Sequence, residues 1–275
     1  MSRSRGKPKP DLLGDPALIE GDKGAGLPTV SATDLPFETK ELRAGLSRFT
    51  NQVFKFEDGR ETRLGAVRWG VYAFFDYDGK PIYVGQTKAT FGDRIGRHLT
   101  NQRTDVVAMN VLDPFEVHSI KVWPLPQFQR VTKDSPKEER TAAIRHLNAL
   151  EFQVFESLQH EEFSFLNEKD PIRPTDSYQV EIPTEISGQV VSDEVKRLRD
   201  HPDLRIARRA STLAKLAQKI SERDVNPGLR RAMVSQATRL LDLAKQRYDA
   251  VQDLRRRGVI VVPDAVDDER DDSIS

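Results

Sequence analysis

Residues Trp69–Gly79 read WGVYAFFDYDG, and residues Lys80–Thr87 continue the chain with KPIYVGQT. Both stretches are rich in β-branched and aromatic residues, and the pair Asp78-Gly79 separates them, which is a strong short-range signal for a β-hairpin. The sequence therefore predicts two antiparallel strands at this place, and the rest of the chain can be arranged around them.

The register of this hairpin decides which side chains share a face. If Asp78-Gly79 is a two-residue turn, Tyr77 faces Lys80 and opposed residue numbers add up to 157. Because side chains alternate along a strand, Tyr72, Tyr83 and the glycine at 85 then lie on one face, with open space beside the glycine. Strand tyrosines usually do no more than cover a sheet, so the hairpin alone leaves both interpretations open.

The segments that follow complete a small domain. Thr90 and Asp93 form a capping-box pattern that opens a helix through about Asn101. Residues 115–125 alternate as a third strand, and residues 135–159 form a long amphipathic helix. The fold class that we predict is α/β (α+β), with a small three-stranded antiparallel sheet flanked by helices.

The composition divides the chain into five parts. Residues 1–35 are rich in Pro, Gly and small polar residues and predict a flexible N-terminal arm. Residues 36–68 hold a lead-in helix, extending from Phe37 to about Phe56, and a connector. The small α/β domain is predicted at 69–171, a basic helical accessory region at 192–258, and an acidic tail at 259–275.

Several protein classes are excluded by composition. The 275 residues include no cysteine, which rules out disulfides, thiolate metal sites and a cysteine nucleophile. No apolar run approaches the length of a membrane span, so we expect no membrane partner. The basic start has no apolar segment behind it and is not a secretory signal. We therefore expect a cytoplasmic protein.

The accessory region carries most of the positive charge. Two long helices, separated at Asn226-Pro-Gly, are predicted to form an αα-hairpin. Residues 194–257 contain 17 Lys or Arg and 8 Asp or Glu, whereas residues 69–168 have a net charge of −3. This region is either a DNA-binding surface or the charged face of a structural or dimerising hairpin. The candidate DNA-binding residues are Arg208, Arg209, Arg230 and Arg231.

Four other side chains are candidates for chemistry. Arg94 and His98 are four residues apart and share one helix face. Glu151 lies inside an apolar stretch, where a carboxylate needs a partner or a metal because a bare buried charge is costly. Glu156 is a competing acid, and neither acid is decided by its own surroundings.

The ordered series of these residues resembles the GIY-YIG nuclease family. The first tripeptide is Gly70-Val71-Tyr72 and the second is Tyr83-Val84-Gly85, with Val in place of Ile in both. Arg94 and His98 follow in the pattern R-x-x-x-H, and then come an acid on a later helix and Asn167. The resemblance covers roughly residues 69–168, with an insertion around residues 102–140.

What the resemblance implies is hydrolysis of a phosphodiester bond with one divalent ion, Mg²⁺ or Mn²⁺, per active site. Glu151 is the implied metal ligand and Glu156 the fallback. Tyr72 is implied as the general base, although it and Tyr83 could exchange roles. A phenol is a weak base at neutral pH unless cations lower its pKa, and Lys88 is a candidate for this.

The remaining residues of the implied site would bind the phosphate or hold other groups of the site in position. Arg94 suits the charged transition state, since its planar fork binds two oxygens. His98 would position a water or phosphate, or assist proton transfer, and Asn167 would support the site through its amide.

The function that we predict is a metal-dependent endonuclease, cleaving double-stranded DNA as restriction, homing or phage-defence enzymes do. One alternative is a catalytically inactive DNA-binding or scaffold protein that keeps the fold. Another is a repair or RNA nuclease. A core with one site makes one nick per encounter, so a homodimer is one route to double-strand cleavage.

Overall fold

The computed structural model describes residues 36–100, 112–159, 165–167, 171–174, 178–222, 225 and 227–259. The predicted N-terminal arm and the acidic tail beyond residue 259 lie outside the described residues. Short 3₁₀ helices connect some of the elements below, at Leu64–Ala66, Pro114–Glu116 and Pro126–Phe128.

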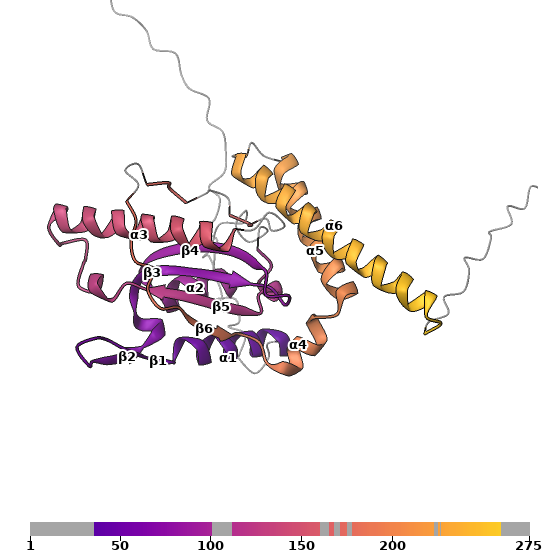
Figure 1. The fold of residues 1–275 in the computed structure, drawn as a ribbon, viewed down its shortest axis with the longest axis horizontal. Coiled ribbons are helices and arrows are strands. Elements are labelled where there is room, and N and C mark those ends of the chain that lie inside the picture. Colours follow the sequence, from indigo (N-terminus) through magenta and orange to yellow (C-terminus); the bar gives the residue numbers. More distant parts are fainter. Residues whose placement is uncertain are drawn as a thin grey trace, which may run out of the picture. The chain divides into compact units, whose positions relative to one another are not determined.

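A four-stranded antiparallel sheet forms the centre of the α/β domain (Figure 1). Its strands are β3 (Arg68–Phe75), β4 (Pro81–Thr90), β5 (Ser119–Pro124) and β6 (Ile186–Gln189), in the order β4-β3-β5-β6. The mixed α/β class is confirmed, and the three predicted strands are present. β6 is an addition that the sequence did not reveal, because it is short and contains a serine and a glycine.

The hairpin has the predicted register but a different turn. Tyr72 lies opposite Gly85, as predicted. However, the amide of Asp76, not of Tyr77, donates to the carbonyl of Lys80, at 2.9 Å. The connection is therefore a three-residue loop that ends at Gly79, which has a φ of +71°. A register shift near the end of β3 compensates for the extra loop residue, so the two departures cancel.

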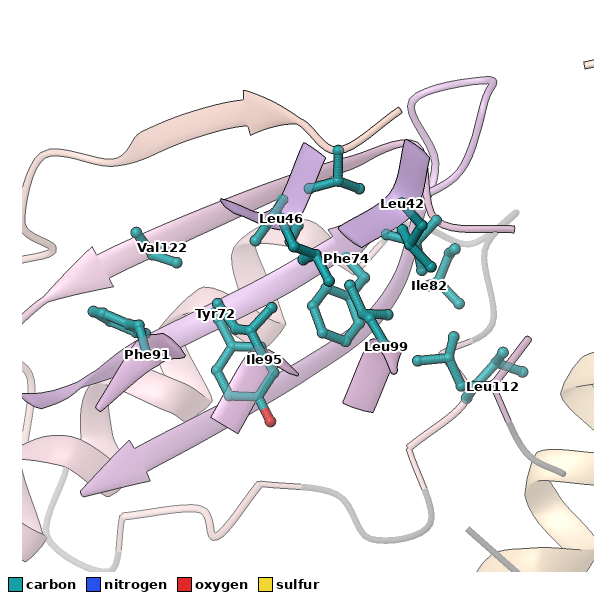
Figure 2. Packing of buried hydrophobic residues seen from close by; sticks show 14 of the residues in the cluster. Leu42, Leu46, Tyr72, Phe74, Ile82, Phe91, Ile95, Leu99, Leu112 and Val122 are labelled. Atoms are coloured by element: carbon teal, nitrogen blue, oxygen red, sulfur yellow. The ribbon is translucent and has the colours of Figure 1, made fainter. Parts of the chain in front are cut away.

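Three helices cover the two faces of the sheet. α1 (Phe37–Thr50) and α2 (Phe91–Leu99) pack on the face that carries Tyr72, and α3 (Lys137–Leu158) packs on the opposite face. α2 begins as predicted, because the Thr90 hydroxyl accepts a hydrogen bond from the Asp93 amide at 3.1 Å. Figure 2 shows Ile95 and Leu99 of α2 close to the aromatic rings of β3. The helix is thereby fixed against the sheet on the tyrosine side.

The lead-in helix is shorter than predicted. α1 ends at Thr50, and the residues that follow form a separate hairpin of β1 (Val53–Lys55) and β2 (Glu61–Arg63). The pair Asp58-Gly59 makes its turn, with Gly59 at a φ of +81°. This is the same turn signal that identified the main hairpin, and it could have identified this one.

The C-terminal region is helical, as predicted. It consists of α4 (Asp193–Arg199), α5 (Pro202–Glu222) and α6 (Pro227–Arg256), and α5 packs along α6 as a hairpin. Leu216 and Leu229 belong to the same hydrophobic cluster as Tyr72. The accessory helices and the sheet therefore share one core. Within the described ranges, every helix is too short or too polar for a membrane span.

Candidate active site at the edge of the sheet

Tyr72 is the centre of a buried polar cluster. Its hydroxyl lies 2.8 Å from Nε2 of His98, and Nε of Arg94 donates to the same oxygen at 3.2 Å. Both partners come from α2, one turn apart, so the cap and the apolar anchors of that helix aim them together. The ring of Tyr72 is fully buried and His98 is 5% exposed. The predicted grouping of these three residues is present in the structure.

Tyr83 lies against Tyr72 and His98. Its ring centroid is 6.1 Å from that of Tyr72 and 5.2 Å from that of His98, and it is partly exposed. Gly85 is required beside them, since a Cβ there would lie 2.7 Å from the Tyr72 hydroxyl and 2.8 Å from the Tyr83 ring. The space next to the glycine is thus filled by the two tyrosines.

The pKa of Tyr72 is well above that of an ordinary tyrosine. Burial is the main cause, the neighbouring Tyr83 adds to it, and the charge and hydrogen bond of Arg94 oppose it. Lys88 is exposed further along β4, and no hydrogen bond or ion pair among the described residues connects it to Tyr72. Arg94 therefore supplies the opposing charge that was expected of Lys88.

Glu151 approaches the edge of the sheet from the other face. It is 9% exposed on α3, and Nε2 of Gln86 donates to its Oε2 at 2.9 Å. Burial raises the pKa of the Glu151 carboxyl to about 7, although the Gln86 hydrogen bond and the Arg94 charge oppose the shift. The carboxylate is therefore short of positive partners.

Gln86 was not singled out from the sequence. The same Nε2 also donates to Oδ1 of Asn148 at 2.9 Å, so Gln86 joins β4 to two positions on α3. The alternation along β4 places residue 86 on the face opposite to the tyrosines. That pattern could have directed attention to it.

The fallback acid is elsewhere. The side chain of Glu156 is 51% exposed and lies 3.6 Å from Nη2 of Arg173. No interaction among the described residues joins it to Tyr72 or Arg94. The structure brings Glu151, and not Glu156, within electrostatic range of Arg94.

A divalent ion fits the donor chemistry at Glu151. The described residues contain no group of three or more His, Asp or Glu side chains arranged to hold a metal. A lone carboxylate suits Mg²⁺, which keeps several waters and takes a phosphate oxygen. A bound cation would also stabilise the charged form of a carboxyl whose pKa burial raises to about 7.

Asn167 binds the backbone of the second tripeptide. Its Oδ1 accepts from the Val84 amide at 3.1 Å, and its Nδ2 donates to the Val84 carbonyl at 2.6 Å. β4 is an edge strand of the sheet, so these groups would otherwise have no partner strand on that side. Asn167 therefore holds the strand that carries Tyr83.

The candidate DNA-binding arginines divide into two kinds. Arg209 is 6% exposed and donates to Glu116 at 2.9 Å, and Arg208 donates to both oxygens of Glu38 at 3.1 Å. Arg230 and Arg231 are exposed at the start of α6. Only this second pair presents charge on the surface.

A network of buried arginines, two buried carboxylates and the more exposed Asp78 joins the accessory helices to the main hairpin. Asp76 is fully buried and accepts from Arg239 at 2.6 Å and from Arg209 at 3.3 Å. Arg205 makes a bidentate pair with Asp78 at 2.9 and 2.7 Å. We call this set the arginine network; its members are Arg205, Arg209, Arg239, Asp76, Asp78 and Glu116.

The antiparallel sheet, the paired tyrosines and the helix that carries arginine and histidine form a mixed α/β domain. Residues 68–127 match the GIY-YIG catalytic domain, and this segment belongs to the GIY-YIG nuclease family. GIY-YIG domains are generally nucleases that use divalent metals. The match includes both tyrosines, Arg94 and His98, and it ends before Glu151 and Asn167. No curated protein and no solved structure matched the chain.

Proposed function

We propose that this protein is a divalent-metal-dependent endonuclease that hydrolyses phosphodiester bonds in double-stranded DNA, as restriction, homing or phage-defence enzymes do. The observation that carries the proposal is the convergence of Tyr72, on the inner strand β3, with Arg94 and His98 of α2, where the charge of Arg94 also acts on Glu151. An inactive scaffold would have no physical need for a carboxylate that is buried without an ion pair, as Glu151 is.

Tyr72 and His98 provide a path for a proton. When His98 carries its proton on Nδ1, the neutral Tyr72 hydroxyl donates to Nε2 of His98 while it accepts from Arg94. A proton that Tyr72 takes from an attacking water can therefore leave through the imidazole. Tyr83 is the partly exposed member of the pair, and it would hold the water or a phosphate oxygen.

Arg94 binds the charge that develops on the phosphate. Its Nε is engaged by Tyr72, which leaves the terminal nitrogens of the guanidinium to face non-bridging oxygens. Positive charge held in place before reaction stabilises the transition state more than a flexible cation would.

Glu151 would hold one Mg²⁺ or Mn²⁺ ion, with Gln86 fixing the orientation of the carboxylate. When bound, the ion polarises the scissile phosphate and stabilises the leaving oxygen. For this the carboxyl must be deprotonated, and with its pKa at about 7 in the metal-free protein, binding of the ion releases a proton near neutral pH.

Arg230 and Arg231 are the arginines that we propose for contact with DNA. Nη2 of Arg231 donates to the backbone carbonyl of Asn167 at 3.4 Å, so the start of α6 lies beside the strand that carries Tyr83. The catalytic segment is itself net negative, and phosphate binding needs cations from elsewhere. Arg208 and Arg209 are engaged in internal ion pairs and contribute less.

The test is cleavage of supercoiled plasmid by the purified protein with Mg²⁺, beside an EDTA control, the Glu151→Ala variant and the matched Glu156→Ala variant. We expect nicked or linear product that EDTA and Glu151→Ala abolish and Glu156→Ala retains. Loss of activity in Glu156→Ala alone would transfer the metal ligand to that residue. Absence of cleavage on a genomic DNA library, with DNA binding retained, would favour the scaffold, and cleavage of RNA alone would identify an RNA nuclease.

A further inference from the structure

Helix α6 has two apolar faces, but its hairpin partner can cover only one. Leu229, Ala232 and Leu243 are buried. On almost the opposite side of the helix, Val234 and Leu241 are 62% and 52% exposed. A helix that belongs only to a hairpin is expected to have one apolar stripe and a polar remainder.

The exposed stripe follows a heptad pattern. Val234, Leu241 and Tyr248 are seven residues apart, and Tyr248 is 64% exposed. Ala237, which is exposed, and Ala244 and Val251, which are half-buried, lie three residues after each of them, so the stripe alternates by three and four residues over two and a half heptads. This is the spacing at which one helix packs along another. We call these six residues the α6 stripe.

We propose that the α6 stripe binds the same stripe of a second copy of this chain, with the two helices antiparallel. In a two-fold symmetric pair, opposed residues then add up to 485. Leu241 faces Ala244 of the partner subunit, Tyr248 faces Ala237 of the partner subunit, and the two valines face each other. Each large side chain is placed against a small one, which is how helix surfaces fill space without voids.

A parallel pair of the same stripe does not have this fit. Each residue would meet its own copy, so that two Tyr248 rings would crowd one layer and pairs of alanines would leave adjacent layers empty. The size pattern therefore selects the antiparallel arrangement.

The flanking charges and the contact area agree with an antiparallel pair. Lys245 is placed near Thr238 of the partner subunit, and Arg247 near Leu240 of the partner subunit, so no like charges meet. The stripe is about 26 Å long on a helix about 10 Å wide. Pairing buries roughly 800 to 1,000 Å² in total, near the lower limit for a specific interface, so we expect a dissociation constant in the micromolar range.

The consequence for function depends on the nuclease proposal above. One copy carries one Tyr72–Glu151 site, and a two-fold dimer carries two, which is what cleavage of both DNA strands needs. The dimer itself is measured without any cleavage assay, so its failure and the failure of the nuclease proposal can be told apart.

The orientation is tested by disulfide crosslinking, because the natural chain contains no cysteine. We expect the full-length protein with both Val234→Cys and Val251→Cys to form a covalent dimer under mild oxidation, and Val234→Cys alone to remain uncrosslinked. A control pair, Gln246→Cys with Asp249→Cys, lies off the stripe and should not crosslink. Efficient crosslinking of Val234→Cys alone would show a parallel pair and overturn the proposal.

Sedimentation equilibrium tests the stripe itself. We expect Leu241→Lys to weaken the dimer at least tenfold, whereas Leu204→Lys, at an equally exposed leucine of α5 (50%), should leave it unchanged. Exchange of sizes within one layer, Leu241→Ala with Ala244→Leu, should restore most of the affinity that Leu241→Ala alone removes. A wild-type protein that remains monomeric up to about 100 µM would overturn the proposal.

Discussion

The molecule contains two buried polar clusters with opposite electrostatic balance. In the arginine network, Asp76 accepts from both Arg239 and Arg209, and Arg205 holds the pKa of Asp78 below its usual value through a bidentate hydrogen bond. In the candidate active site, by contrast, burial raises the pKa of both Tyr72 and Glu151 above their usual values.

The difference separates a structural cluster from a reactive one. Paired charges stabilise a geometry. A buried ionisable group without an oppositely charged partner is instead stabilised when a substrate or an ion binds to it. Two members of the network are exceptions. Burial raises the pKa of Glu116 although Arg209 and Arg205 oppose this, and its Oε1 has no hydrogen-bond partner among the described residues. Burial also lowers the pKa of the Arg239 guanidinium, although the charge of Asp76 opposes the shift. The two clusters therefore differ in how far positive and negative charges compensate each other over the whole cluster, and not at every residue.

The largest effect is expected at the active site. Tyr72→Phe and Arg94→Ala should each lower the cleavage rate about 10³-fold, since they remove a proton acceptor and a transition-state cation. Arg94→Lys should recover little, because a point charge does not reproduce the planar fork. Rates are measured in single-turnover experiments, and denaturation curves show that the variants are folded. If Tyr83→Phe is the more damaging tyrosine variant, the two tyrosines exchange roles.

Substitutions in the arginine network should instead change the free energy of unfolding. Arg239→Met leaves Asp76 buried with less compensation and should cost about 3 kcal/mol of the free energy of unfolding. Arg247→Met, on the same helix but in an exposed pair with Asp203, is the control and should leave it unchanged within error. Urea denaturation measures both. Equal effects of the two variants would show that the network does not stabilise the junction between α6 and the hairpin.

The main hairpin could be predicted because its information is local. Alternating side chains and an Asp-Gly turn determine which residues share a face, and Tyr72 lies opposite Gly85 as predicted. The register is correct although the turn is not, since a three-residue loop and a shift in pairing offset each other. That Arg94 and His98 share one helix face follows from helix periodicity, whereas their choice as site residues depended on the family resemblance.

The arginine network could not be predicted because its pairs are remote in sequence. Arg209 is 93 residues from Glu116, and Arg239 is 163 residues from Asp76. From the sequence, these arginines contribute to a basic region that suggests DNA binding. In the fold they neutralise acids of the main hairpin, so net charge overestimates the positive surface of the accessory helices.

An effect of intermediate size is expected in the pH dependence of the free energy of unfolding. It tests whether the Glu151 carboxyl is buried without an ion pair. Its folded pKa of about 7 lies above the model-peptide value of 4.5, so between these values the folded protein binds more protons than the unfolded one. In EDTA, stability should therefore fall as pH rises from about 4.5 to 7. Glu151→Gln should remove this dependence and add roughly 2 kcal/mol at pH 8. Indistinguishable pH profiles of the two proteins, measured by urea denaturation, would contradict the assignment.

The smallest effect is expected at Gln86, whose amide donates to Oε2 of Glu151 and to Oδ1 of Asn148. Gln86→Leu keeps a side chain of similar size on β4 but lets the carboxylate rotate, and loss of such an orienting partner weakens metal binding about tenfold. Asn148→Ala leaves the Gln86–Glu151 hydrogen bond in place, so its effect on affinity should be smaller. Calorimetric titration with Mn²⁺ measures affinity directly, without substrate. If Gln86→Leu binds the ion as tightly as the wild-type protein, the carboxylate is oriented by its helix alone, and the active site owes its geometry to fewer partners than the structure suggests.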